Sequence, residues 1–122
     1  MLRSGLYIIS TPIGNLQDIS ARALEILREA SVIACEDTRV SKKLFSLLGI
    51  GLQKKFITYQ DHNEEEMAQK IADLAATEAV ALVSDAGAPL ISDPGYKLVR
   101  LCRRQNVYVT AIPGACAVIA AL

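Results

Sequence analysis

Side chains that can transfer a proton or bind a phosphate gather in the short segment Glu36-Asp37-Thr38-Arg39. Its carboxylates and guanidinium could position a hydroxyl group, accept a proton or bind a phosphate. The structural alternative is a helix cap, in which Thr38 is the N-cap of the following helix and Arg39 tunes Asp37. The residue types alone leave both interpretations open.

His62 is the second candidate, because it is the only histidine and it stands between Asp61 and Asn63. An imidazole titrates near neutral pH and suits acid–base catalysis. The alternative is an exposed loop in which Asn63 caps the next helix.

A third candidate lies in the stretch 79–95, where an apolar run suited to a buried strand leads into a loop with Asp85 and Asp93. Asp93 precedes a proline and is predicted to be the N-cap of a helix. Asp85 is therefore the freer carboxylate. Because the spacing of the two aspartates fits no standard metal motif, we expect no metal site.

The remaining loops are rich in glycine and proline, TPIGN at 11–15 and PGAC at 113–116. Neither contains the G-x-G-x-x-G of dinucleotide sites or the G-K-[ST] of phosphate loops. The common nucleotide-binding folds therefore lose support.

Hydrophobic periodicity predicts that strands and helices alternate along the chain. We expect strands at 6–10, 31–35, 56–59, 79–83 and 107–112, and helices at 19–30, 40–48 and 95–106, with another between the third and fourth strands. Asp18 is the predicted cap of the first helix and Gly49 the predicted end of the second, while Met67, Ile71, Leu74 and Ala75 form the core stripe of the third. The fold class is α/β, a five-stranded and mainly parallel sheet with helices on both faces. All five loops then share one edge of the sheet.

Composition restricts the class of protein further. The 122 residues suffice for one domain, 52% are hydrophobic, and 13 basic residues balance 13 acidic ones, so no net charge favours nucleic acid or a membrane. The adjacent basic pairs at 42–43, 54–55 and 103–104 would contact RNA only if several cations converged. Buried thiols and the lack of a targeting or membrane-spanning segment predict a cytoplasmic protein, the cysteines being Cys35, Cys102 and Cys116.

The chain resembles a known family through five motifs. In chain order they are LYIISTPIGNLQDISARALEIL, EDTR, DHNE, SDAGAPLISDPGYKLVR and IPGACA. Together they closely resemble the 16S ribosomal RNA cytidine 2′-O-methyltransferases of the tetrapyrrole methylase superfamily. The resemblance implies S-adenosyl-L-methionine as cofactor, 16S rRNA in the small ribosomal subunit as substrate and a homodimer. It also implies that residues 1–122 form the amino-terminal domain of a two-domain enzyme and are inactive alone. An apolar helix that runs to residue 122 without a cap agrees with this expectation.

Carried over residue by residue, the resemblance implies a cofactor site on three loops. Its predicted members are Ile13, Gly14, Asp85, Gly87, Ala88, Leu90, Ile91, Gly114 and Ala115. Ala88 stands where the family has the aspartate of a Gly-Asp-Pro loop, so either Asp85 or another residue must replace that carboxylate. The candidate catalytic residues are Asp37, Arg39 and His62, facing the RNA.

Two other functions fit the same fold. A sister enzyme could methylate a tetrapyrrole, although EDTR, DHN and the basic pairs favour RNA. A non-enzymatic α/β domain that binds a ligand is the alternative from a different class.

Overall fold

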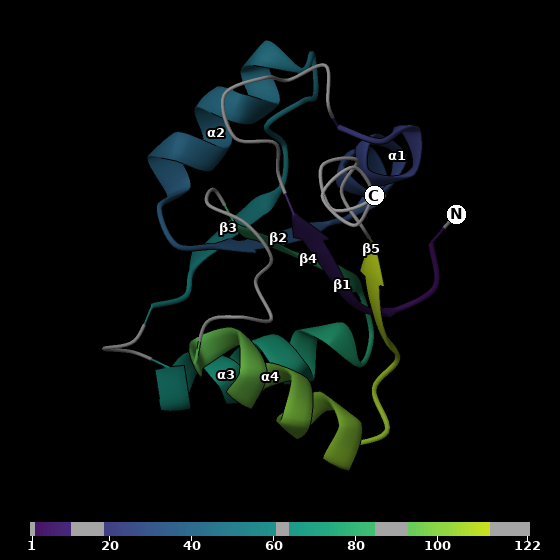
Figure 1. The fold of residues 1–122 in the computed structure, drawn as a ribbon, viewed down its shortest axis with the longest axis vertical. Helices are drawn as coiled ribbons and strands as arrows, with labels where there is room; N and C mark the ends of the chain where they lie inside the picture. Colours follow the sequence, from purple (N-terminus) through teal and green to yellow (C-terminus); the bar gives the residue numbers. More distant parts are fainter. Residues whose placement is uncertain (1, 11–18, 61–63, 85–92, 113–122) are drawn as a thin grey trace, which may run out of the picture.

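The computed structural model describes residues 2–10, 19–60, 64–84 and 93–112 (Figure 1). These residues form the strands β1 (Gly5–Ser10), β2 (Val32–Cys35), β3 (Lys55–Thr58), β4 (Ala79–Ser84) and β5 (Val109–Ile112). The helices between them are α1 (Ala21–Glu29), α2 (Thr38–Leu47), α3 (Glu64–Ala75) and α4 (Asp93–Arg104). The predicted alternation of strand and helix is therefore confirmed.

The five strands make one sheet in the order β3-β2-β4-β1-β5. Every neighbouring pair is parallel, and the register of β1 with β4 runs from Gly5 opposite Ala79 to Ser10 opposite Ser84. The predicted parallel α/β sheet is confirmed. Because all strands point the same way, their carboxyl ends lie along one side of the sheet, the carboxyl edge.

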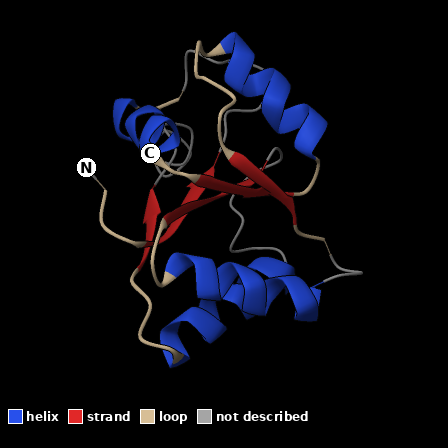
Figure 2. Cartoon of the chain, turned by 180° about the vertical axis from the view of Figure 1, so that it is seen from behind, coloured by secondary structure: helices blue, strands red, loops and turns tan. Residues whose placement is uncertain are grey.

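Two pairs of helices cover the sheet, with α1 and α2 on one face and α3 and α4 on the other (Figures 1 and 2). Right-handed crossovers produce this division, since the chain moves toward β3 through α1 and α2 and returns through α3 and α4. In the described part of the chain, no helix is long and apolar enough to cross a membrane.

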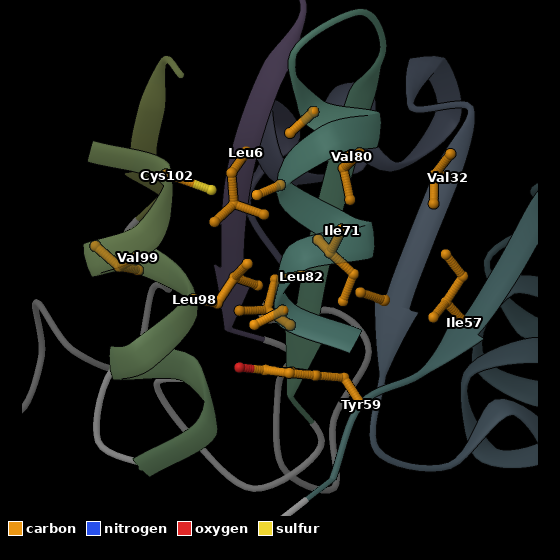
Figure 3. Packing of buried hydrophobic residues seen from close by; sticks show 14 of the residues in the cluster. Leu6, Val32, Ile57, Tyr59, Ile71, Val80, Leu82, Leu98, Val99 and Cys102 are labelled. Atoms are coloured by element: carbon orange, nitrogen blue, oxygen red, sulfur yellow. The ribbon is translucent and has the colours of Figure 1, made fainter. Parts of the chain in front are cut away.

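Alternate residues of β1 enter two separate cores. Leu6 and Ile8 pack with α3 and α4, whereas Tyr7 and Ile9 pack with α1 and α2. Figure 3 shows the first core, where Leu6 and Leu82 from the sheet meet Ile71 of α3 and Leu98 of α4. A strand buried on both faces reads as a continuous apolar run, which is why the sequence predicted it well.

The helix ends correct one prediction and confirm another. Ser20, not Asp18, caps α1, because its hydroxyl oxygen accepts the backbone N–H of Ala23 at 3.1 Å. Gly49 ends α2 as predicted, with φ +73°. The N–H groups of Gly49 and Ile50 donate to the carbonyls of Ser46 and Phe45, so two of the last carbonyls of α2 are satisfied.

The core stripe of α3 is only partly as predicted. Ile71 and Ala75 are buried, but Met67 and Leu74 pack at the border, and Ala68 and Ala72 complete the buried side. Small alanines allow α3 to lie close to the sheet and α4.

β5 begins two residues later than expected because the end of α4 uses the preceding residues. Asn106 adopts φ +58°, and the N–H of Val107 donates to the carbonyl of Cys102 at 2.9 Å. This is again a helix end with a left-handed residue, here asparagine in place of glycine.

Gly5 lies where β1 touches Tyr108, and we predict that Gly5→Ala destabilises the fold. An added Cβ would lie 2.7 Å from the Tyr108 carbonyl oxygen, at a backbone φ of +153°. That oxygen is held by the N–H of Leu6 at 2.8 Å and cannot move away freely. Denaturant unfolding should show a loss of about 2 kcal/mol.

Gly51→Ala is the matched control for this substitution, because nothing lies within 4 Å of its added Cβ. Its free energy of unfolding should change by less than about 0.5 kcal/mol. Equal effects of the two substitutions would contradict the close contact at Gly5.

Cys102 is fully buried in α4 beside Leu6 (Figure 3), and burial raises the pKa of its thiol to about 11. The pKa of an exposed thiol is about 8.5, so the folded state keeps this proton up to a higher pH than the unfolded state does. The protonated thiol therefore contributes to the free energy of unfolding. This contribution is complete below the pKa of the unfolded state and is lost as the pH rises through the pKa of the folded state. Cys102→Ala should therefore cost less stability at pH 11 than at pH 8.

Unfolding of the wild type and of the variant at several pH values measures this difference. Val99→Ala, a non-titrating change in the same helix and core, should cost the same at both pH values. A cost of Cys102→Ala that does not depend on pH would contradict the prediction.

Candidate functional site

The carboxyl edge brings together the starting points of all five candidate loops. Ser10 pairs with Ser84, Cys35 with Val83 and Thr58, and Ile9 with Ile112. The chain therefore leaves the five strands at nearly the same level. The convergence predicted from parallel strands is confirmed for these starting points.

The chain changes face between β1 and β4, which are neighbours in the sheet. It continues from β1 to α1 on one face and from β4 to α4 on the other (Figure 1). In open α/β sheets, ligands bind outside the carboxyl ends of strands at such a switch point. The segments 11–18 and 85–92 follow these two strands, and 113–122 follows β5 beside β1.

The predicted cofactor residues lie in those three segments, outside the described residues. They are Ile13, Gly14, Asp85, Gly87, Ala88, Leu90, Ile91, Gly114 and Ala115. Their site stays a prediction. The expected N-cap at Asp93 is wrong by one residue, because Asp93 already belongs to α4.

Asp37 and Arg39 are the predicted catalytic residues that the structure describes. Asp37, in extended conformation with φ −133° and ψ 113°, caps α2 and accepts the backbone N–H of Arg39 at 2.9 Å. The expected cap at Thr38 is wrong by one residue, because Thr38 already belongs to the helix. Asp37 satisfies one of the free N–H groups of the first turn.

The side chain of Arg39 also reaches Asp37, with Nε 3.5 Å from Oδ1. The Arg39 backbone N–H, followed by its guanidinium, holds the pKa of the Asp37 carboxyl below its usual value. A carboxylate with a lowered pKa is a weak base at neutral pH. These contacts fit a group that orients Arg39, whose side chain is 91% exposed at the carboxyl edge.

Gln60 connects the ends of β2 and β3 at this edge, and the sequence did not indicate this role. Its Nε2 donates to the backbone carbonyl of Glu36 at 2.6 Å, while the N–H of Tyr59 donates to the carbonyl of Cys35 at 2.8 Å. The chain therefore enters the segment of Asp61 and His62 directly beside Glu36. His62 itself lies outside the described residues. A polar residue directly after the strand expected at 56–59 was the available signal for Gln60.

Ser41 is a second residue that the sequence did not indicate. It is fully buried in α2, and its hydroxyl has no hydrogen-bond partner among the described residues. Buried polar groups are almost always paired, so this hydroxyl is unusual in a core of apolar side chains.

The ranges described here contain no group of three or more His, Cys, Asp or Glu side chains that could hold a metal ion. A hollow of about 470 Å³ opens at the opposite edge of the sheet, lined by Leu2, Ser4, Glu29, Ser31, Thr77, Glu78 and Ala79. Its Ser31 hydroxyl donates to the Glu78 carboxylate at 3.0 Å, and none of the predicted site residues lies there.

Comparison with known sequences identifies the family. The sequence profile of the tetrapyrrole (corrin/porphyrin) methylases matches residues 5–122. The chain belongs to this family. The family assignment agrees with the five-stranded parallel sheet and its carboxyl-edge loops.

Two relatives, both named ribosomal RNA small subunit methyltransferase I, are about half identical to the chain. The protein from Pasteurella multocida is 52% identical over 118 residues, which cover 96% of this chain and 41% of that protein. The protein from Rickettsia prowazekii is 49% identical over 123 residues, which cover 43% of that protein. The chain thus spans less than half the length of these relatives.

Solved structures of more distant proteins share the fold. Uroporphyrin-III-C-methyltransferase from Thermus thermophilus superimposes with a TM-score of 0.69 at 19% identity, over 93% of this chain and 48% of that one. Diphthine synthase superimposes with a TM-score of 0.68 at 22% identity, over 90% of this chain and 43% of that one. At such identities the likeness concerns the fold alone.

We predict that Asp37→Ala lowers the melting temperature more than Asp37→Asn, because asparagine can still accept the Arg39 N–H. The stabilisation from the carboxylate is present above its unfolded pKa, about 3.9, and is lost as the pH falls through the lower folded pKa. The difference in melting temperature between the wild type and Asp37→Ala should therefore become smaller at acidic pH. Thermal melts from neutral pH down to about pH 2.5 measure it, and a constant gap would contradict the capping role.

Proposed function

We propose that the protein carrying this chain transfers a methyl group from S-adenosyl-L-methionine to the 2′-hydroxyl of a cytidine ribose in 16S rRNA. The observation that carries the proposal is the 52% identity over 118 residues to a ribosomal RNA small subunit methyltransferase I. This identity is far above the 19–22% shared with the solved structures of the same fold, which carry the names of other enzymes. It therefore favours RNA over a tetrapyrrole.

The carboxyl edge fits a cofactor that lacks phosphate groups. The three segments that follow β1, β4 and β5 in the sequence contain glycines, prolines and apolar residues, and no phosphate-binding motif. In the proposed site, Ile13, Gly14, Gly114 and Ala115 contribute backbone and apolar contacts from one side. Gly87, Ala88, Leu90 and Ile91 do so from the other, with Asp85 as the carboxylate for a polar end of the ligand.

The cofactor supplies an electrophilic methyl group on a sulfonium, and the reaction leaves S-adenosylhomocysteine, a 2′-O-methyl ribose and a proton. The task of the chain is to hold the two reactants in line, and such alignment can contribute up to about 7 to 11 kcal/mol. A parallel sheet with loops at one edge suits this task, because the loops after β1, β2 and β4 follow buried strands.

The candidate catalytic residues act on the acceptor side in this proposal. Arg39, oriented by Asp37, presents a cation to the RNA, and the proposed role of His62 is to accept the released proton. The bond from Gln60 to Glu36 holds the chain just before this histidine at the edge where α2 begins.

The proposed enzyme is a cytoplasmic homodimer that recognises rRNA within the small ribosomal subunit. The relatives are more than twice as long as this chain, so we propose a second domain that completes the cofactor site. Residues 1–122 alone should then bind cofactor weakly and show no activity.

Calorimetry of the full-length protein with S-adenosylhomocysteine, followed by methylation of small ribosomal subunits, tests the proposal. We predict that Asp85→Ala weakens S-adenosylhomocysteine binding about tenfold or more, because it removes a charged hydrogen-bond partner. Asp73→Ala, an exposed aspartate on α3 that accepts from Gln69 at 2.8 Å, should leave binding unchanged.

The possible results separate the alternatives. Absence of cofactor binding would reject a methyltransferase and favour a non-enzymatic domain. Cofactor binding with methylation of a tetrapyrrole but not of ribosomal subunits would reject RNA as the substrate. Equal affinity of wild type and Asp85→Ala would remove Asp85 from the site.

A further inference from the structure

Helix α2 carries positive charge only, although the whole chain has no net charge. It contains Arg39, Lys42 and Lys43 and no carboxylate. On the other face of the sheet, α3 begins with three consecutive glutamates, 64–66. The charge is therefore segregated, with cations beside the start of α2 and anions beside the start of α3, and both helices start at the carboxyl edge.

The cations of α2 form one exposed stripe. Residues three and four positions apart lie on the same side of a helix, so Arg39 is next to both Lys42 and Lys43. All three are exposed, whereas Ser41 and Phe45 on the opposite side are buried. We call this stripe, Arg39, Lys42 and Lys43, the α2 basic face.

Neighbouring groups orient these cations without neutralising all of them. The Lys42 ammonium lies 5.3 Å from the centre of the Phe56 ring, and Arg39 lies against Asp37. Within the part of the chain that the structure describes, no carboxylate forms an ion pair with either lysine. The face thus keeps positive charge for a partner.

The other basic pairs do not offer such a surface. The Lys54 ammonium donates to the carbonyls of Arg28 and Ala30, at 2.7 and 2.6 Å, and so joins the end of α1 to β3. Arg103 and Arg104 lie in the last turn of α4, toward the opposite edge of the sheet. α2, in contrast, begins at the carboxyl edge and places its cations from the first turn onward.

We propose that the α2 basic face binds the phosphate backbone of the RNA substrate and positions the target nucleotide at the carboxyl edge. This inference rests on the proposed function, since it requires an RNA substrate. Arginine binds phosphate with a planar fork, and lysines add point charges. Contacts of this kind fix the position of the RNA and do not read its sequence.

The test uses the full-length protein with the double substitution Lys42→Gln and Lys43→Gln. Arg39 is left intact because it is a candidate catalytic residue. Binding to small ribosomal subunits should weaken about tenfold, and the slope of log affinity against log salt should decrease by about 2, one for each lost phosphate contact. kcat at saturating subunits and affinity for S-adenosylhomocysteine should not change.

The matched control is Arg103→Gln with Arg104→Gln, which removes the same charge from an adjacent exposed pair on α4. It should leave the affinity and the salt slope as in the wild type. An unchanged affinity in the α2 variant, or an equal loss in both variants, would overturn the inference. A protein that binds RNA through these lysines but does not bind the cofactor would reject the proposed function and keep the inference.

Discussion

The whole arrangement depends on the parallel pairing of β1 with β4 on one side and β5 on the other. The register of these strands is fixed because β1 is buried on both faces, so a shift by one residue would exchange its two cores. Gly5 adds a second restraint, since only glycine allows β1 to approach Tyr108 this closely. As a result, the segments after residues 10, 84 and 112 start side by side, although they are far apart in the sequence.

The same topology also places helices of different charge on the two faces of the sheet. The switch between β1 and β4 sends the chain to opposite faces, which is where a ligand site is expected. The charges of the flanking helices then differ by face, basic on α2 and acidic at the start of α3. Under the proposed function, this polarity favours an approach of RNA from the side of α2.

Much of the fold could be predicted because burial on both faces produces continuous apolar runs, as in 79–83, and because helices separate all the strands. Caps were harder. Asp18 and Ser20, or Asp37 and Thr38, have similar preferences, and the choice depends on the backbone angles of one residue. The bond between Gln60 and Glu36 depends on the pairing of β2 with β3, which no local pattern reveals. The cofactor residues came from a resemblance, and they stay predictions.

The role of Asp37 as a cap limits the ways in which the proposed reaction can lose its proton. A carboxylate that accepts the Arg39 N–H in the first turn of α2 and has a lowered pKa is a poor acceptor for the proton of a ribose hydroxyl. A strong base is not required, however, because an oxygen that is gaining a methyl group becomes a much stronger acid as the new bond forms. The proton can therefore leave late, to a weak base such as an imidazole or water. The demand on the protein is then mainly positional. This agrees with an exposed arginine held by its own helix cap and with the buried parallel strands β1, β2 and β4 that lead into three of the loops.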